Sequence, residues 1–329
     1  MSKRKADLLS YKNSRIMRIG IDIMGGDFAP QSTIAGSFLA RNYIPDDTEL
    51  MLFGDKESII QISKNNGFDV NKVSLVHCPE KIEMSDHPYK AFFTKKLSSI
   101  HQGYKMLREG TIDAFCSAGN TGAMMIGASQ VINSIPGIIR PAIAANVPNL
   151  SGRHAVLLDV GLNPDSRPDV LYQYGILGRA YAKSLNGFGE PRVGLINIGK
   201  EEEKGNLTAK STYQLMHEAT DYEFIGNIEG NEIFLDPGAE VLVCDGFVGN
   251  IILKEAESFY KLIKSRKIED DFFELFNFEN FGGTVILGIN KPVVVGHGIS
   301  NDIAIKNMIL KTWEVVKNNL VNNIKAALE

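Results

Sequence analysis

The chain has 329 residues, of which 44% are hydrophobic and 22% are charged, as is ordinary for a globular protein in water. Its formal net charge is −4 and no basic patch dominates, which argues against nucleic acid as a partner. The sequence contains no run of roughly 18 or more apolar residues, so we expect no membrane-spanning helix. We therefore expect a cytoplasmic protein, large enough for one α/β domain or two lobes that share a core.

The cysteines and the first residues fit this compartment. Cys78, Cys116 and Cys244 show no C-x-x-C spacing and cannot all pair, as expected in a reducing cytoplasm. Cys116 and Cys244 end apolar strands, so core packing is favoured over a role as a thioester-forming nucleophile. Residues 1–16 are polar, partly basic and without the apolar core of a signal peptide. We expect them to be a disordered lead-in to a single domain that spans 17–329.

Apolar runs and glycine turns predict strands and helices that alternate along most of the chain. The first strand begins at Arg18, and a helix opens at Ala123 after a strand at 114–116 and a polar loop. Further strands are predicted at 49–53, 73–78, 143–147, 155–159, 193–197, 224–226, 241–244 and 293–295. Further helices are predicted at 32–41, 56–65, 98–109, 207–218, 250–265 and 301–328, with an irregular surface loop at 81–94. This alternation predicts an α/β protein with three αβα layers and a mostly parallel sheet.

A loop of small polar residues, Ser-Ala-Gly-Asn-Thr-Gly, precedes the helix that opens at Ala123. Free N–H groups at such a switch from strand to helix can contact an anion, and glycines allow a close approach. The alternative is an ordinary tight turn with nothing bound. The loop is neither a Walker loop nor the dinucleotide pattern G-x-G-x-x-G. Its candidate phosphate contacts are Ser117, Gly119, Asn120, Thr121 and Gly122.

Polar, glycine-flanked residues also follow several other predicted strands. Ligands of parallel sheets bind beyond the carboxyl ends of the strands, so we expect these loops to meet at one end of the sheet and form one cleft. Its further candidate phosphate- or acyl-binding residues are Asp22, Gly25, Gly26, Asp27, Asp159, Asn163, Asn197, Asp245, Gly246, Asn250 and Ser300.

The four aspartates of this set, Asp22, Asp27, Asp159 and Asp245, allow two interpretations. Carboxylates can bind a divalent metal, but these lie on separate loops with no His-rich spacing beside them. We favour the alternative, in which some of them cap helices or hold loops through backbone N–H groups. The sequence therefore predicts no metal and no cofactor.

Two side chains in these loops are candidates for catalysis. Lys204 precedes Gly-Asn at the start of a predicted helix, where a cation can clamp an oxyanion, although a solvated surface lysine is the usual alternative. His297 lies between two glycines at a strand end. A histidine there can donate to an anion or a leaving group near neutral pH, and the alternative is a structural histidine bonded to backbone.

Ten short motifs occur in a fixed order between Arg18 and about Leu310. They include Ile-Asp-Ile-Met-Gly-Gly-Asp at 21–27, Ser-Ala-Gly-Asn-Thr-Gly-Ala at 117–123 and Gly-His-Gly at 296–298. The others lie at 140–142, 158–161, 191–195, 203–206, 224–227, 244–250 and 281–283. Taken together, they resemble the bacterial acyl-carrier-protein:phosphate acyltransferases of phospholipid synthesis.

The resemblance implies transfer of a fatty acyl group from acyl-carrier protein to inorganic phosphate, which gives acyl phosphate for a downstream glycerol-3-phosphate acyltransferase. It also implies a homodimer, no metal, at most peripheral contact with the inner face of the membrane, and a fold like those of the phosphotransacetylases and the isocitrate/isopropylmalate dehydrogenases. The amides of the 117–122 loop and Lys204 would hold phosphate beside the thioester carbon. Asn206 or His297 would donate to the tetrahedral oxyanion.

The chain departs from the family pattern at Phe28, Leu162, Lys200 and Ile299. Its segment 254–282 is shorter than the family's helical excursion, which is associated with dimer, carrier-protein and membrane contacts, and its apolar residues favour core or dimer face over membrane. Three other functions remain open: a phosphotransacetylase-like enzyme that uses acyl-coenzyme A, a non-catalytic protein that binds acyl chains or carrier protein, and a metal-dependent hydroxyacid dehydrogenase on the same general fold.

Overall fold

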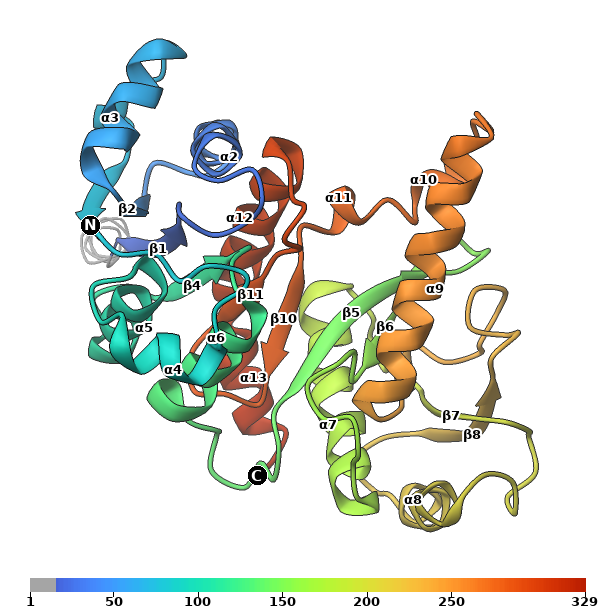
Figure 1. Ribbon diagram of the computed structural model, residues 1–329. Coiled ribbons are helices and arrows are strands. Elements are labelled where there is room, and N and C mark those ends of the chain that lie inside the picture. Colours follow the sequence, from blue (N-terminus) through green and yellow to red (C-terminus); the bar gives the residue numbers. More distant parts are fainter. Residues whose placement is uncertain (1–15) are drawn as a thin grey trace, which may run out of the picture.

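The computed structural model describes residues 16–329, so the predicted lead-in lies, apart from Ile16, outside the described residues. Within them, an 11-stranded sheet runs through the molecule in the order β3-β2-β1-β4-β11-β10-β5-β6-β9-β7-β8 (Figure 1). The strands are β1 (Met17–Asp22), β2 (Thr48–Gly54), β3 (Ser74–His77), β4 (Ala114–Ser117), β5 (Ala142–Pro148), β6 (His154–Leu158), β7 (Val193–Asn197), β8 (Phe224–Glu229), β9 (Val241–Val243), β10 (Thr284–Leu287) and β11 (Val293–Val295).

Helices flank this sheet, and several begin where the sequence supplies a capping side chain. Asp55 accepts from the N–H of Ser58 and Asn301 from that of Ala304, which satisfies donors that a helix start leaves unpaired. The helices are α2 (Gln31–Arg41), α3 (Lys56–Asn65), α4 (Pro88–Thr94), α5 (Ser99–Glu109), α6 (Thr121–Gly127), α7 (Pro168–Leu185), α8 (Leu207–His217), α9 (Gly246–Ser265), α10 (Asp271–Glu274), α11 (Phe278–Phe281), α12 (Asp302–Lys317) and α13 (Leu320–Ala326).

The sheet consists of two parallel halves that run in opposite directions. Strands β3, β2, β1, β4 and β11 are parallel to one another, as are β6, β9, β7 and β8. Between the halves, β10 pairs antiparallel with both β11 and β5, and β5 pairs antiparallel with β6. The carboxyl ends of β6, β7 and β9 therefore lie at the opposite end from those of β1, β4 and β11. The expectation that all the loops meet at one end was wrong, because β5 and β10 reverse the direction.

The side chains of alternate strand residues pack on opposite faces of the sheet. On one face, Cys116 and Ala144 join a continuous core with residues of α2, α7, α12 and α13. On the other face the core is divided. Phe115 packs beneath α4, α5 and α6, whereas Ile143 belongs to a cluster against which α9 packs. Figure 1 shows α4, α5 and α6 on one half of the sheet and α9 on the other half. We call this side of the sheet the divided face.

The predicted α/β class with a mostly parallel sheet is confirmed, and several details differ. The 81–94 segment, expected to be irregular, contains α4, which begins at Pro88 with its fixed φ. The sequence analysis missed α7 and β10. The long helix expected at 301–328 is interrupted at Asn319, which adopts a left-handed conformation between α12 and α13.

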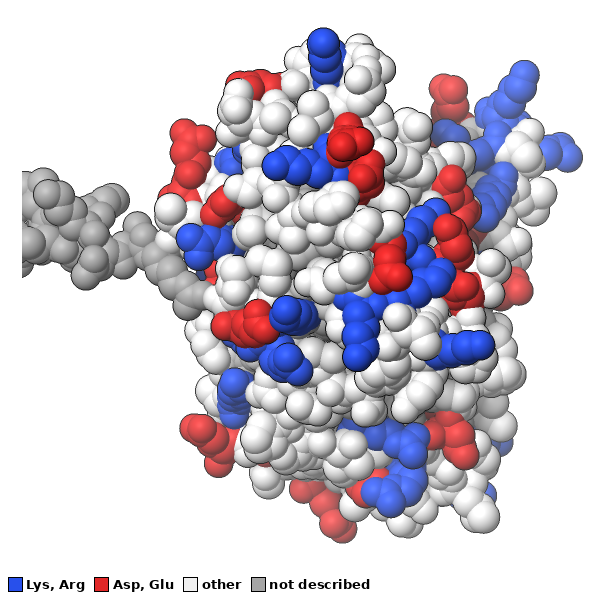
Figure 2. All heavy atoms as spheres, turned by 60° about the vertical axis from the view of Figure 1, so that its left-hand side comes forward, with Lys and Arg blue, Asp and Glu red and all other residues white. Residues whose placement is uncertain are grey.

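The surface carries charges of both signs. Figure 2 brings the left-hand side of Figure 1 toward the viewer. On this face, Lys and Arg side chains are interspersed with Asp and Glu side chains. No helix among residues 16–329 has the length and hydrophobicity that a membrane crossing requires.

Candidate active site

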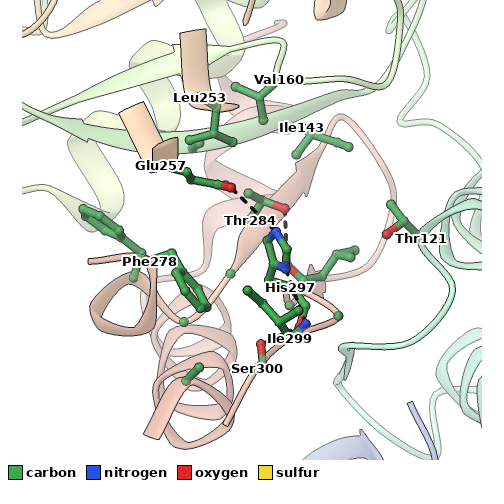
Figure 3. A pocket seen from close by; sticks show the side chains of 18 of the residues that line it. Thr121, Ile143, Val160, Leu253, Glu257, Phe278, Thr284, His297, Ile299 and Ser300 are labelled. Carbon is green, nitrogen blue, oxygen red and sulfur yellow. Dashed lines mark hydrogen bonds and ion pairs between the residues drawn. The ribbon is translucent and has the colours of Figure 1, made fainter. Parts of the chain in front are cut away.

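A cavity of about 440 Å³ lies on the divided face, between α9 and the loops that follow β1, β4 and β11. Strands β5, β10 and β11 contribute to its walls, together with α11 (Figure 3). Of the residues predicted from the sequence, five line it: Asp27, Thr121, Asn250, His297 and Ser300. The cavity therefore collects residues from both halves of the sheet, although the strand ends that carry them point in opposite directions.

His297 forms a charged group with two residues of α9. Lys254 Nζ lies 3.2 Å from His297 Nε2, and Glu257 Oε2 lies 3.7 Å from the same nitrogen. Lys254 also donates to both carboxylate oxygens of Glu257, at 3.0 and 2.8 Å. Burial of the ring, together with the Lys254 ammonium, lowers the pKa of His297 below its ordinary value of 6.5. The imidazole is therefore neutral near pH 7 and able to accept a proton.

Helix α9 runs from a fixed first turn, which lies against the loop after β6, to the side of His297. Asp245 caps it by accepting from Val248 N at 2.8 Å. Gly249 is pressed against the backbone, since a Cβ there would lie 1.9 Å from Asp159 O. With a rise of about 1.5 Å per residue, the helix carries Glu257 about 16 Å from Gly246. Helix α9 thus connects the carboxyl end of β9 with the carboxyl end of β11.

The loops after β1, β4 and β11 are bonded to one another. Ser117 Oγ donates to Asp22 Oδ2 at 2.6 Å and accepts from Gly119 N at 2.9 Å. A Cβ at Gly25 would lie 2.6 Å from Gly119 N, so only glycine allows this approach. Burial raises the pKa of the Asp22 carboxyl, against the lowering effect of the Ser117 hydrogen bond. Asp22, Ser117, Gly25 and Gly119 therefore form a tight junction of two loops.

The loop after β11 is bonded to the loop after β1 through a backbone hydrogen bond. Asp27 N donates to Gly298 O at 2.8 Å, and a Cβ at Gly26 would lie 3.3 Å from the same oxygen. Ser300 Oγ donates to His297 O at 2.6 Å. These bonds fix the loop that carries His297 against the loop that carries Asp27.

Asn120 connects the 117–122 loop to the segment before α4. Its Oδ1 caps α6 by accepting from Ala123 N at 3.0 Å, and its Nδ2 donates to the carbonyls of Glu83, Met84 and Asp86 at 3.0–3.3 Å. A Cβ at Gly122 would lie 2.4 Å from the ring of Pro88. The polar side chain of Asn120 is thus used within the protein, while Thr121 faces the cavity.

Asp159 and Asn163 shape the loop after β6. Asp159 accepts from the N–H groups of Ile143 and Asn163 at 2.9 and 2.7 Å. Asn163 Nδ2 donates to Pro141 O and to the Tyr174 hydroxyl, and its carbonyl accepts from Gly246 N at 2.8 Å. Asn250 Nδ2 donates to Val160 O at 3.3 Å. In this half, Asp159 and Asp245 hold loops and cap α9, which is the interpretation favoured from the sequence.

The loop between β7 and α8 carries Lys204 and Asn206 and does not line the cavity. Asn206 Oδ1 caps α8 by accepting from Ala209 N at 2.8 Å. Asn197 Nδ2 donates to Lys204 O at 3.2 Å and to Asn227 Oδ1 at 3.1 Å. Lys204 Nζ lies 3.9 Å from Glu201 Oε2. The backbone of this loop is well bonded, and the exposed Lys204 ammonium can meet an anion.

The cysteines are buried thiols rather than thiolates. Burial raises the pKa of Cys78 and of Cys116 to about 12, and that of Cys244 well above its ordinary value. A thiol with such a pKa is a poor nucleophile at neutral pH. In the described part of the chain, no three His, Cys, Asp or Glu side chains are grouped so as to hold a metal ion.

Comparisons with known proteins add to this geometry. The family model described as "Fatty acid synthesis protein" matches residues 17–269. The phosphate acyltransferase of Geobacillus thermodenitrificans is 38% identical over 332 residues, which cover 95% of this chain and 99% of that protein. That of Desulfitobacterium hafniense is 38% identical over 331 residues, covering 95% and 98%. The chain belongs to the phosphate acyltransferase family. The family expected from the ten motifs, a family of acyltransferases, is therefore confirmed.

Similar solved structures show the fold of this family member. A phosphotransacetylase from Streptococcus pyogenes superimposes with a TM-score of 0.66 at 17% identity, covering 96% of this chain and 100% of the other. The EutD phosphotransacetylase from Staphylococcus aureus gives 0.61 at 17% identity, covering 94% and 98%. The phosphotransacetylase-like fold expected from the resemblance is thus confirmed.

Sequence reasoning missed two charged residues of the cavity in this family member, Lys254 and Glu257. Both belong to a helix in which Lys and Glu usually form exposed pairs, and neither is flanked by glycine. The available signal was their spacing, since residues three apart on a helix share a face. That face is directed toward His297 only once β9 and β11 are placed, and this placement is not a local property of the sequence.

Proposed function

We propose that the protein transfers a fatty acyl group from acyl-carrier protein to inorganic phosphate. The observation that supports this most directly is the cavity in which Lys254 and the neutral His297 adjoin an apolar wall. A cation suits phosphate, and a neutral imidazole suits proton transfer. An apolar wall suits a fatty acyl chain. The phosphate acyltransferase family, to which the chain belongs, is consistent with this combination.

The proposed reaction needs positioning and one proton transfer. An oxygen of hydrogen phosphate attacks the carbonyl carbon of the thioester, and the tetrahedral intermediate collapses as the carbon–sulfur bond breaks. His297 accepts the phosphate proton and returns it to the leaving thiolate, which gives acyl phosphate and the free thiol of the carrier protein. Because a thiolate leaves readily, no stronger acid than imidazolium is required.

Two lysines can hold the phosphate. Lys254 lies beside His297, whereas Lys204 projects from a loop that does not line the cavity. We propose Lys254 as the cation nearest to the reacting atoms. Lys204, with Asn206, would act on phosphate that approaches along the β7–α8 loop. The backbone N–H of Thr121, which lines the cavity at the start of α6, would add a hydrogen bond to the anion or to the oxyanion.

We also propose the setting implied by the resemblance. It comprises a cytoplasmic homodimer with at most peripheral membrane contact, no metal or cofactor, and a glycerol-3-phosphate acyltransferase that consumes the acyl phosphate.

The deciding experiment follows phosphate-dependent release of free thiol from palmitoyl-acyl-carrier protein. We expect release by the wild type that requires phosphate. Release from palmitoyl-coenzyme A but not from the carrier-protein thioester would instead favour a coenzyme A enzyme. A folded protein that binds palmitoyl-acyl-carrier protein and releases no thiol from either donor would be a binding protein.

A further inference from the structure

One side of the cavity is lined by aliphatic side chains. On the side of β5 and the first turns of α9, four apolar side chains line it: Ile143, Ala145, Val160 and Leu253. Figure 3 shows Ile143, Val160 and Leu253 together on one side of His297. The group of Lys254, Glu257 and His297 adjoins this apolar part. Phe278 and Ile299 line the cavity elsewhere.

The polar side chains that border the apolar part are already bonded within the protein. Asn250 Nδ2 donates to Val160 O at 3.3 Å, and Asn146 Oδ1 accepts from Asn186 Nδ2 at 3.2 Å. Thr284 Oγ1 donates to Val295 O at 3.3 Å. Each of these three side chains thus has one polar atom engaged within the protein, and the four other side chains of this part are hydrocarbon, so a ligand finds few polar partners here. It gains by burying apolar surface.

We infer that the apolar part is the binding site for the acyl chain. The chain lies along Ile143, Ala145, Val160 and Leu253, with its thioester carbon at His297. This inference rests on the proposed function and specifies where that function places the alkyl group. A nucleotide fits poorly here, because its base and phosphates need hydrogen-bond partners that four hydrocarbon side chains do not supply. Each methylene that the site buries strengthens binding about fourfold.

Helix α9 offers a matched pair of positions for a test. Leu253 lines the cavity, whereas its neighbour Ile252 packs against the same apolar cluster without lining the cavity. Leu253→Phe places extra volume in the site, and Ile252→Phe places the same kind of side chain outside it. Leu253→Ala enlarges the site, so a folding failure of one variant leaves a second one available.

The first measurement is kcat/KM for acyl-carrier-protein thioesters with chains of about 8 to 18 carbons, in steps of about two methylenes. The wild type is expected to gain activity with length up to an optimum within this range. Leu253→Phe is expected to lower kcat/KM for the palmitoyl substrate roughly 10-fold and to change that for the octanoyl substrate less than about twofold. Leu253→Ala is expected to move the optimum to longer chains. Ile252→Phe is expected to keep the wild-type profile. Equal profiles for the wild type and both Leu253 variants would overturn the inference.

The second measurement separates the acyl site from the reaction. Binding of cis-parinarate, a fluorescent fatty acid, is followed without phosphate or carrier protein. We expect Leu253→Phe to weaken this binding roughly 10-fold relative to Ile252→Phe. If that occurs and no variant releases thiol, the acyl site stands and the proposed reaction falls. If thiol is released normally and parinarate binds equally to both variants, the reaction stands and the acyl site is wrong.

Discussion

The two lysines near candidate sites show how differently similar side chains can be placed. Lys254 on α9 and Lys204 on the β7–α8 loop have nearly equal side-chain exposure, 50% and 47%. Lys254 lies 3.2 Å from His297 and faces the cavity, whereas Lys204 lies in a glycine-containing loop outside it. Glycine-flanked motifs indicate where the backbone bends. They do not indicate which cavity a side chain faces, because that depends on how distant strands are paired.

The strongest test of this comparison removes His297, which the cavity centres on. We expect His297→Gln to lower kcat about 10²–10⁴-fold, because the amide cannot carry the proton from phosphate to thiolate. Phosphate-dependent thiol release measures the effect, and circular dichroism confirms that the variant is folded. A variant that retains at least half of the wild-type kcat would exclude His297 from proton transfer.

The next test compares the lysines directly. Lys254→Met is expected to lower kcat/KM for phosphate about 10- to 100-fold, because a hydrogen bond to a charged group contributes about 1.5–3 kcal/mol. Lys204→Met serves as the matched variant, and a smaller loss is expected. Kinetics over a range of phosphate concentrations at saturating acyl donor give both values. A larger loss in Lys204→Met would reverse their assigned roles and bring the β7–α8 loop to the reacting atoms.

The pH dependence sharpens the role of Glu257. Its carboxylate raises the pKa of His297 and the Lys254 ammonium lowers it. In the proposed reaction the neutral imidazole accepts a proton, so we expect activity to fall as the pH decreases through the pKa of His297. Glu257→Gln is therefore expected to move the acid limb of the kcat/KM profile to lower pH, and Lys254→Met to move it to higher pH. Shifts in the same direction for both variants would contradict the geometry of the group.

The smallest expected effect concerns Asn206, which caps α8. We expect Asn206→Ala to lower the free energy of unfolding by about 1 kcal/mol and Asn206→Asp to preserve it, because aspartate also caps helices. Urea denaturation measures both. Thiol release by the two variants then separates capping from a role in the reaction. If Asn206→Asp is as stable as the wild type and yet inactive, the amide N–H₂ group acts on the substrate.

The sequence was sufficient for the fold class and family. Alternating strands and helices predicted the α/β sheet, and the ten ordered motifs predicted the family. Capping by Asp245 agrees with the interpretation favoured from the sequence for some of the four aspartates. Capping by Asn206 was not predicted, although it also depends only on nearby residues. These features are local in sequence or repeated within a family, and are therefore readable from one chain.

The remaining features depend on long-range pairing. The reversal of strand direction at β5 and β10 could not be read from the sequence, since β10 was not predicted and the direction of a strand depends on which strands it pairs with. Helix α7 was missed although most of its inward face is buried. The Lys254–Glu257–His297 group requires the distant segments α9 and β11 to meet. Only tertiary packing brings such residues together.

Helix α9 has a consequence for how a distant contact can reach the reaction. Its first turn is fixed by Asp245 and by the close approach of Gly249, whereas Phe259 and Leu262 near its other end are exposed. The helix is thus held at its first turn, while two apolar side chains near its other end are exposed. Lys254 and Glu257 lie part-way along it, so a tilt about the first turn would move Glu257 by roughly half as much as the exposed end. A partner that contacts Phe259 and Leu262 and tilts α9 would therefore also shift the Lys254 ammonium and the Glu257 carboxylate beside His297.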